Sequence, residues 1–188
     1  MNYYLEIRLR PDLEFSPQIL MNALISKLHR ALVSLRSDDI GVSFPEYQLS
    51  PRELGERLRI HGTETRLRQL MDSGWLAGMS DHAEKTDVLL APESGEYCLV
   101  RRRQVKSNVE RLRRRRMKRK GGSYEEAVVA IPAEVERKSK LPFATLNSRS
   151  SGEVFKLFVN QQVSFKEPRN GEFNTYGLSQ GATVPWFE

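Results

Sequence analysis

The chain of 188 residues has little of what several common kinds of functional site need. It contains a single cysteine, Cys98, which excludes an internal disulfide and a cysteine-based metal cluster. No group of histidine, cysteine or carboxylate residues has the spacing of metal ligands, and neither a Walker loop nor a G-x-S-x-G motif occurs. We therefore expect no metal, no cofactor and a reducing, cytoplasmic setting.

Long apolar runs are missing as well. Hydrophobic residues make up 39% of the chain, which is enough for a core, but no stretch approaches membrane-spanning length. The opening residues, MNYYLEIRLR, lack the apolar run of a signal peptide. We expect a protein with no membrane contact, built as one ordinary domain or two small ones.

Positive charge, in contrast, is abundant and local. Residues 101–120, RRRQVKSNVERLRRRRMKRK, hold twelve Lys/Arg and one acid, Glu110, for a net charge of +11. The whole chain carries +6, so the other 168 residues carry −5. A basic block on an otherwise acidic chain indicates a binding site for a polyanion.

The basic block has the boundaries of a helix. Ser107 and Glu110 have the spacing of a capping box, and Gly121-Gly122 supplies a left-handed stop, so we predict an arginine-rich helix over about 108–120. Beyond Leu112 this helix is cationic on almost every side and has little to bury, so we expect its second half to project from the globule. The alternative is a solvated charge run or a disordered basic arm.

The elements before the basic block follow the order β-α-β-β-α-β of a ferredoxin-like domain. Alternating apolar residues predict a strand at Tyr3–Leu9, and Ser16-Pro17 starts a helix with an apolar stripe from Ile19 to Leu35. We predict an α+β fold in which a ferredoxin-like N-terminal domain, 1–95, precedes a smaller mixed α/β domain, 96–188, that carries the arginine-rich helix and a serine-rich turn. The other predicted strands are 40–44, 54–61, 86–90, 96–104, 143–149, 153–160, 172–178 and 183–187, and a second helix begins at Thr63.

The strand that leads into the basic block carries two side chains that could read bases. A period of two places Arg102 and Gln104 on one face, about 7 Å apart. An arginine fork matches the guanine O6/N7 edge, and a glutamine amide matches the adenine N6/N7 edge. The alternative is that both are ordinary polar positions on a solvated strand.

Among the three histidines, His29 is the candidate for proton transfer. It lies on the edge of the apolar stripe of the first helix, between Ile25 and Leu32, where a partly buried neutral imidazole could act as general base or acid. A purely structural histidine at the edge of the core is the alternative. We assign no role to His61 or His82.

The C-terminal half contains a hydroxyl-rich turn and two notable aromatic residues. The turn, Asn147–Gly152, could hold phosphate or ribose oxygens, and Phe155 beside it could stack on a base. Tyr176 precedes Gly177 and could cover a site. Equally, serines before glycine are common in turns, Phe155 alternates like a core residue, and Tyr176 could simply end a strand.

Several segments together resemble a known family. They are YYLEIRLRPD, I-G-V-S-F-P, L-G-E-R-L-R-I-H, K-S-N-x-E-R-L-R-R-R, L-P-F-x-T-L-x-S-x-S-x-G, Y-G-L-S-x-G and V-P-W-F, in this order from the first strand to the end of the sequence. This set resembles the CRISPR repeat-RNA processing endoribonucleases of type I-F systems.

The resemblance implies a metal-independent endoribonuclease. Such an enzyme binds the stem-loop of CRISPR repeat RNA and cuts at the stem base by 2′-hydroxyl attack, which leaves a 2′,3′-cyclic phosphate. It stays bound to the product and serves as a subunit of an RNA-guided surveillance complex. The alternatives are a non-catalytic subunit that binds structured RNA and a DNA-binding protein.

The resemblance also assigns roles to individual residues. His29 would activate the 2′-hydroxyl, Ser148 would hold the ribose, and Tyr176 would orient the histidine. The implied RNA-binding residues are Arg102, Gln104, Ser107, Arg111, Arg114, Arg115, Lys118, Arg119, Lys120, Ser150, Ser151 and Phe155.

Overall fold

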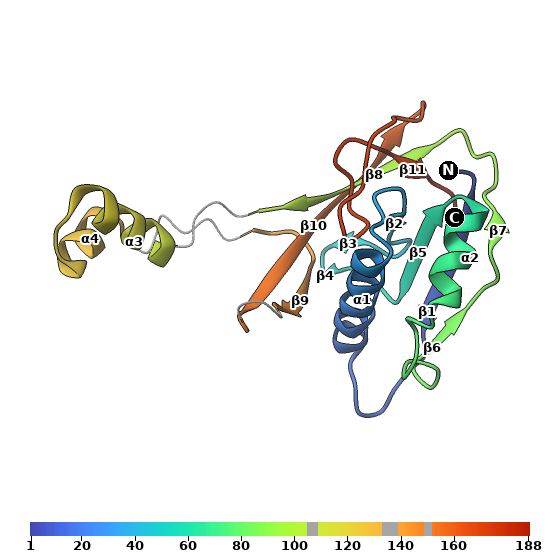
Figure 1. The fold of residues 1–188 in the computed structure, drawn as a ribbon, viewed down its shortest axis with the longest axis horizontal. Helices are drawn as coiled ribbons and strands as arrows, with labels where there is room; N and C mark the ends of the chain where they lie inside the picture. The colour runs from blue at the N-terminus through green and yellow to red at the C-terminus, as the bar shows by residue number, and fades with distance from the viewer. Residues whose placement is uncertain (105–108, 133–138, 149–151) are drawn as a thin grey trace. The chain divides into compact units, whose positions relative to one another are not determined.

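The structure is a computed structural model that describes residues 1–104, 109–132, 139–148 and 152–188. The chain forms two compact units (Figure 1): one contains residues 1–103 and 141–188, and the other contains residues 104–140. The C-terminal strands therefore belong to the same unit as the N-terminal sheet. The unit of residues 104–140 is called the helical unit below, and the other is called the body.

The body contains the predicted ferredoxin-like sheet. Its strands are antiparallel in the order β2-β5-β1-β6, and β7 also pairs with β1. The alternation predicted for β1 is confirmed, because Leu5, Ile7 and Leu9 are all buried. The α+β class with a ferredoxin-like domain is thus confirmed. The strands are β1 (Tyr3–Leu9), β2 (Gly41–Ser43), β5 (Arg57–Gly62), β6 (Ala83–Lys85) and β7 (Leu89–Leu90).

Two helices pack against this sheet. Helix α1 (Pro17–Ser34) begins with proline, as predicted, and buries most of its apolar stripe, although Ile19 is 52% exposed. Helix α2 (Glu64–Asp72) is capped by Thr63, whose hydroxyl accepts a hydrogen bond from the Arg66 amide. A short hairpin of β3 (Gln48–Leu49) and β4 (Arg52–Glu53) lies between β2 and β5 in the sequence.

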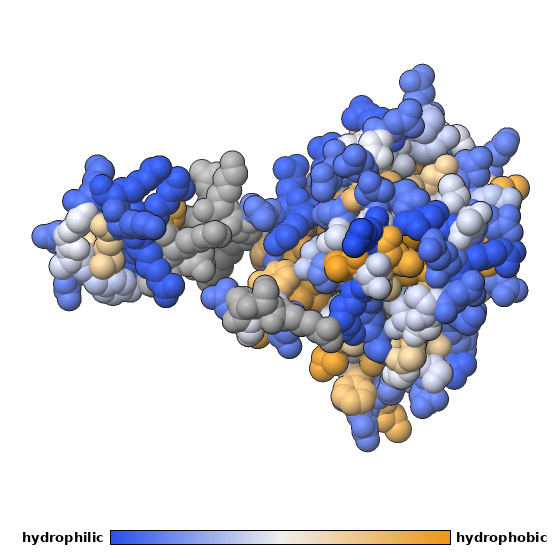
Figure 2. Space-filling view, in the orientation of Figure 1, coloured by the Kyte–Doolittle hydropathy of each residue, from blue (hydrophilic) through white to orange (hydrophobic). Residues whose placement is uncertain are grey.

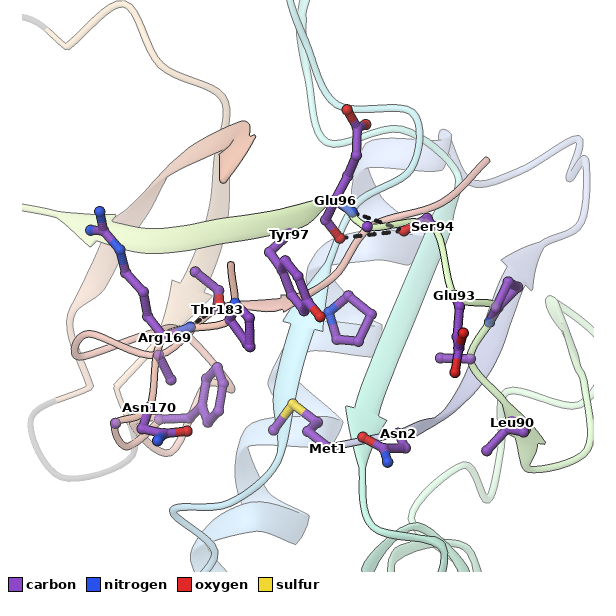
Figure 3. Close-up of a pocket in the computed structure, with 18 residues that line it drawn as sticks. Met1, Asn2, Leu90, Glu93, Ser94, Glu96, Tyr97, Arg169, Asn170 and Thr183 are labelled. Atoms are coloured by element: carbon purple, nitrogen blue, oxygen red, sulfur yellow. Dashed lines mark hydrogen bonds between the residues drawn. The ribbon is translucent and has the colours of Figure 1, made fainter. Parts of the chain in front are cut away.

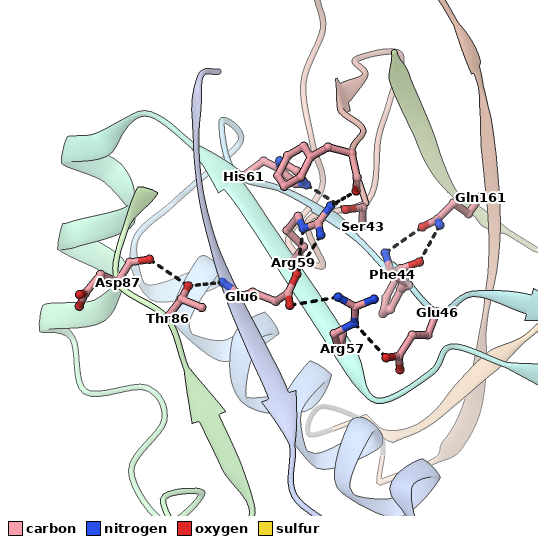
Figure 4. Close-up of polar contacts among 11 residues, drawn as sticks. Glu6, Ser43, Phe44, Glu46, Arg57, Arg59, His61, Thr86, Asp87 and Gln161 are labelled. Atoms are coloured by element: carbon pink, nitrogen blue, oxygen red, sulfur yellow. Dashed lines mark hydrogen bonds and ion pairs between the residues drawn. The ribbon is translucent and has the colours of Figure 1, made fainter. Parts of the chain in front are cut away.

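A second antiparallel sheet completes the body. Its order is β11-β8-β10-β9, with β8 (Tyr97–Arg103), β9 (Phe143–Asn147), β10 (Val154–Phe165) and β11 (Val184–Pro185). The Gln161 amide in β10 makes two hydrogen bonds with the backbone of Phe44, of 2.9 and 2.8 Å (Figure 4). These bonds join the second sheet to the end of β2 across 117 residues of sequence.

The predicted strand at 172–178 is wrong. This segment is a turn in which the Asn174 amide donates to the Leu178 carbonyl, and an isolated bridge joins Phe173 to Ser179. Phe173, Gly177 and Leu178 are buried, and the turn is held by backbone hydrogen bonds from Phe173 to Asp38 and from Val42 to Gly177, which are distant in sequence. In the adjoining region, β10 is longer than predicted and continues to Phe165.

The helical unit contains α3 (Val109–Lys120) and α4 (Tyr124–Ala130). Helix α3 coincides closely with the arginine-rich helix predicted over 108–120, and Gly121 and Gly122 adopt positive φ, as the predicted stop requires. The capping-box residue Ser107 lies outside the described residues. Helix α4 packs along α3, and Val109 and Ala127 are buried in this unit. From Arg113 onward every side chain of α3 is half-buried or exposed, so the second half of the helix has little to bury, as predicted.

Candidate functional site

His29 and Tyr176 are stacked in the body. Their ring centroids are 4.0 Å apart and the planes differ by 7°. The Nδ1 atom of His29 lies 2.9 Å from the carbonyl oxygen of Thr175. A carbonyl oxygen can only accept, so Nδ1 carries the proton and the neutral ring presents the lone pair of Nε2. The imidazole thus has a fixed orientation and a fixed tautomer.

The turn that carries Tyr176 is itself held in place. The Asn174 side-chain oxygen accepts hydrogen bonds from the amides of Tyr176, at 2.8 Å, and Leu178, at 3.2 Å. Gly177 has a φ of 71°, and a Cβ there would lie 2.7 Å from a methyl group of Val42. The roles of Asn174 and of the Thr175 carbonyl were not predicted from the sequence. An asparagine two residues before a Tyr-Gly pair could have indicated this turn, since asparagine side chains commonly accept hydrogen bonds from the backbone of a turn.

Arg102 and Phe155 lie close together on two neighbouring strands, β8 and β10. The Arg102 guanidinium lies 5.8 Å from the centroid of the Phe155 ring, within the range of a cation–π interaction. Burial raises the pKa of Tyr176, and the positive charge of Arg102 partly opposes this shift. We call His29, Arg102, Phe155 and Tyr176 the His29 cluster.

Gln104 does not share the sheet with Arg102. Strand β8 ends at Arg103, whose partner Phe158 is the last residue of β10 paired with β8. On its other edge β10 pairs with β9, from Val154 to Phe158. The strand predicted over 96–104 thus ends at Arg103, and the base-reading role of Gln104, one residue beyond it, stays a prediction.

Ser148 directly follows β9, and two backbone hydrogen bonds hold it in place. Its amide donates to the Glu153 carbonyl, and its carbonyl accepts from the Gly152 amide, each at 2.8 Å. Strand β9 is attached to the helix of His29, because the Asn22 side chain accepts a hydrogen bond from the Thr145 amide at 2.9 Å. Ser148 and His29 thus lie on two elements that pack together. Ser150 and Ser151 lie outside the described residues.

The other two histidines, His61 and His82, make hydrogen bonds to side chains outside the His29 cluster. His61 is fully buried, and its Nε2 lies 2.8 Å from the Ser43 hydroxyl (Figure 4). Burial, assisted by the charge of Arg59, lowers the pKa of His61 to about 3, so this ring stays neutral. The His82 Nδ1 pairs with the Asp12 carboxylate at 2.7 Å. Neither residue is placed to serve the His29 cluster.

A buried arginine fixes the end of the segment that carries Tyr176. Arg59 pairs with Glu6 at 3.0 Å and donates to the carbonyl of Phe187 at 2.6 Å (Figure 4). Its guanidinium also lies 3.9 Å from the Phe187 ring centroid. Burial lowers the pKa of Arg59, while Glu6 opposes the shift. The C-terminal segment is thereby anchored on the ferredoxin-like sheet.

A pocket of about 710 Å³ lies elsewhere in the body (Figure 3). Its walls come from the N-terminus and from the segments 90–97, 168–173 and 182–185. No residue of the His29 cluster and no histidine lines it. Its lining includes the carboxylates of Glu93 and Glu96 and one arginine, Arg169, so it lacks the arginine-rich surface needed for a nucleic acid. Among the described residues, no three histidine, cysteine, aspartate or glutamate side chains are grouped as a metal site.

In the helical unit, α3 presents a row of exposed cations. Figure 2 shows the hydrophilic surface of this unit. Arg113 differs, because it is half-buried and its Nε donates to the Ile131 carbonyl. The side chain of Arg111 is not described. The exposed basic side chains of α3 are Arg114, Arg115, Lys118, Arg119 and Lys120.

None of the described helices is both long and apolar enough to cross a membrane. Free Cys98 is buried in β8, and burial raises the pKa of its thiol to about 12. This thiol is therefore protonated at neutral pH, and it is not positioned as a nucleophile.

Comparison with known proteins gives consistent matches over the full chain. Residues 4–187 match the family described as "CRISPR-associated protein (Cas_Csy4)". A protein of Pseudomonas aeruginosa (strain UCBPP-PA14), named "CRISPR-associated endonuclease Cas6/Csy4", is 49% identical over 187 residues, which is 100% of both chains. A protein with the same name from Escherichia coli (strain UTI89 / UPEC) is 44% identical, again over 100% of both chains.

Proposed function

The chain belongs to the Cas_Csy4 family of CRISPR-associated proteins, and on that premise we propose that it is an endoribonuclease that cuts the stem-loop of CRISPR repeat RNA without a metal ion. The observation that carries this proposal is the orientation of His29. The Thr175 carbonyl accepts a hydrogen bond from Nδ1–H and Tyr176 stacks on the ring, so Nε2 is the atom available to a substrate. An imidazole of this kind is a suitable base near neutral pH.

In the proposed reaction the 2′-hydroxyl at the cut site loses its proton to Nε2 of His29. The 2′-oxygen then attacks the adjacent phosphorus, and the bond from phosphorus to the 5′-oxygen of the next nucleotide breaks. That oxygen takes up a proton, so the products are a 2′,3′-cyclic phosphate and a 5′-hydroxyl. Alignment of the attacking oxygen with the leaving oxygen supplies a large share of the rate. We assign that alignment to Ser148, which would hold the ribose.

We assign the recognition of the stem base to Arg102, Gln104 and Phe155. The Arg102 guanidinium already lies over the Phe155 ring, so the two groups can meet the last base pair together. The Phe155 ring would stack beneath that pair, and Arg102 would donate two hydrogen bonds to a guanine. Gln104 would read the neighbouring pair from a position beyond β8.

We assign binding of the RNA stem to the exposed cations of α3, together with Ser107 and Arg111. A-form major grooves are too narrow for most side chains, but a groove near the loop end of a short hairpin is more open. Each phosphate contact releases counterions, so affinity should fall steeply with salt. Ser150 and Ser151 would contact the scissile phosphate. Because many of these contacts survive cleavage, the enzyme would retain its product and bring it to a surveillance complex.

The test is cleavage of a hairpin repeat RNA in EDTA. We expect one cut at the stem base, and no cut when hydrogen replaces the 2′-hydroxyl at that position. Tight binding of both RNAs without cleavage would contradict the proposed activity and favour a non-catalytic RNA-binding subunit. Equal affinity for a DNA duplex of the same sequence would contradict the proposed choice of substrate.

A further inference from the structure

The two sides of α3 differ in burial. Successive residues of an α-helix are rotated by about 100°. One side of α3 therefore carries residues that are all buried or half-buried, namely Val109, Leu112, Arg113, Arg116 and Met117. The exposed residues Arg114, Arg115 and Lys118 lie on the opposite side, with Arg119 at its margin. Lys120 falls on the first side but is exposed, because it is the last residue of the helix. Because α4 packs against α3 within the same unit, the less exposed side is the one that α4 covers (Figure 1).

Arg113 contacts both ends of α4. Its Nε donates a hydrogen bond of 3.0 Å to the carbonyl of Ile131, the C-cap residue of that helix. Its guanidinium lies 6.0 Å from the centroid of the ring of Tyr124, the first residue of α4. The last carbonyl groups of a helix lack partners within the helix and carry partial negative charge, so a cation placed there is stabilising.

The α3 helix needs such support. Eight of its twelve residues are lysine or arginine, and an isolated helix of this length is marginal even without charge repulsion. Helix α4 supplies a buried contact through Ala127 and is itself closed by the Ser123–Glu126 capping box. Any contact that keeps α4 in place therefore also supports α3.

We propose that Arg113 is a positioning residue: it fastens α4 to α3 and leaves RNA contact to the cations on the opposite side of the helix. The proposal rests on the proposed function, in which α3 binds RNA. The proposal gives different roles to two neighbouring residues, Arg113 and Arg114. Arg114 binds phosphate and contributes to the salt dependence of affinity, whereas Arg113 acts through α4 and contributes nothing to it.

The test compares Arg113→Ala, Arg113→Gln and Arg114→Gln in the full-length protein. Binding of a hairpin repeat RNA is measured over a series of salt concentrations. Glutamine can still donate to the Ile131 carbonyl but has no charge. We expect Arg113→Ala to weaken binding about three- to tenfold at every salt concentration with the slope unchanged. We expect Arg113→Gln to stay within about twofold of the wild type, since its hydrogen bond is retained.

Arg114→Gln is the matched control, because it should lower the salt slope by about one unit. A slope that falls by a similar amount in Arg113→Gln would overturn the proposal, since it would show that Arg113 contacts phosphate.

Amide hydrogen exchange without RNA tests the contact independently of the proposed function. In Arg113→Ala we expect the amides of Ala127 to Ile131 to exchange about fivefold faster, while those of α1 in the body stay unchanged. Unchanged exchange in α4 would refute the fastening role of Arg113. Failure of the wild type to bind the hairpin would instead refute the proposed function.

Discussion

The body and the helical unit are stabilised in different ways. The body has a continuous core of buried apolar side chains that links both sheets and α1. Within the described part of the helical unit, the buried apolar side chains are Val109 and Ala127. The body places its site residues by packing, whereas the helical unit concentrates charge on a small scaffold. A rigid core suits a reaction that depends on fixed geometry, and a charged helix suits a polyanion.

The substitution with the largest expected effect tests the reaction assigned to the body. We expect His29→Ala to lower the single-turnover cleavage rate about 10²- to 10⁴-fold, because the proton acceptor is lost. Hairpin affinity should stay within a few-fold of the wild type, since the exposed cations lie on α3. The measurement is cleavage at saturating enzyme, with binding measured in parallel. His82→Ala is the control and should cut RNA at the wild-type rate. Equal loss of cleavage in His82→Ala would contradict the assignment of the proton acceptor to His29 alone.

The stability of the body should also depend on pH through His61. Its pKa is about 3 in the folded protein and close to 6.5 in the unfolded chain. A lowered pKa contributes stability that is present above pH 6.5 and is lost as the pH falls toward 3. Protonation of His61 in the unfolded chain between pH 6.5 and 3 would lower the free energy of unfolding by up to about 4 kcal/mol.

The measurement is urea unfolding at several pH values for the wild type and His61→Gln. We expect the variant to show a smaller loss between pH 6.5 and 3, whatever its stability at neutral pH. Parallel pH curves for the two proteins would show that His61 does not titrate on unfolding.

Arg102 tests whether the body also reads sequence. We expect Arg102→Ala to reduce the preference for the native base pair at the stem base by about 1–3 kcal/mol, because a bidentate contact to guanine is lost. The measurement is competition between the native hairpin and one with the terminal pair inverted. Arg103→Ala should leave this preference unchanged. An intact preference in Arg102→Ala would show that another group reads the pair.

The smallest expected effect concerns a single cation of the helical unit. We expect Arg115→Ala to weaken hairpin binding and to lower the slope of log affinity against log salt by about one unit. The cleavage rate of bound RNA should not change. Arg68→Ala removes an exposed arginine from the body and should leave the slope as it is. Equal slopes for Arg115→Ala and the wild type would remove Arg115 from the RNA contacts.

Local signals predicted most of the elements correctly. Thr63 caps a helix as expected, and the double glycine ends α3. These features depend on neighbouring residues, so they can be recognised from a short stretch of sequence. The strand at 172–178 failed because its buried residues pack against parts of the chain that are distant in sequence. A domain boundary near residue 95 stays a prediction, while contacts group 141–188 with 1–103.

The sequence by itself determined that the second part of the +11 block forms a helix and that His29 lies at the edge of the apolar stripe of its own helix. The resemblance of its motifs supplied the pairing of His29 with Tyr176. Only the tertiary structure decided which nitrogen of His29 is free, because the carbonyl that fixes the tautomer lies 146 residues away. It also decided which side of α3 is covered, because α4 packs against only one side of that helix.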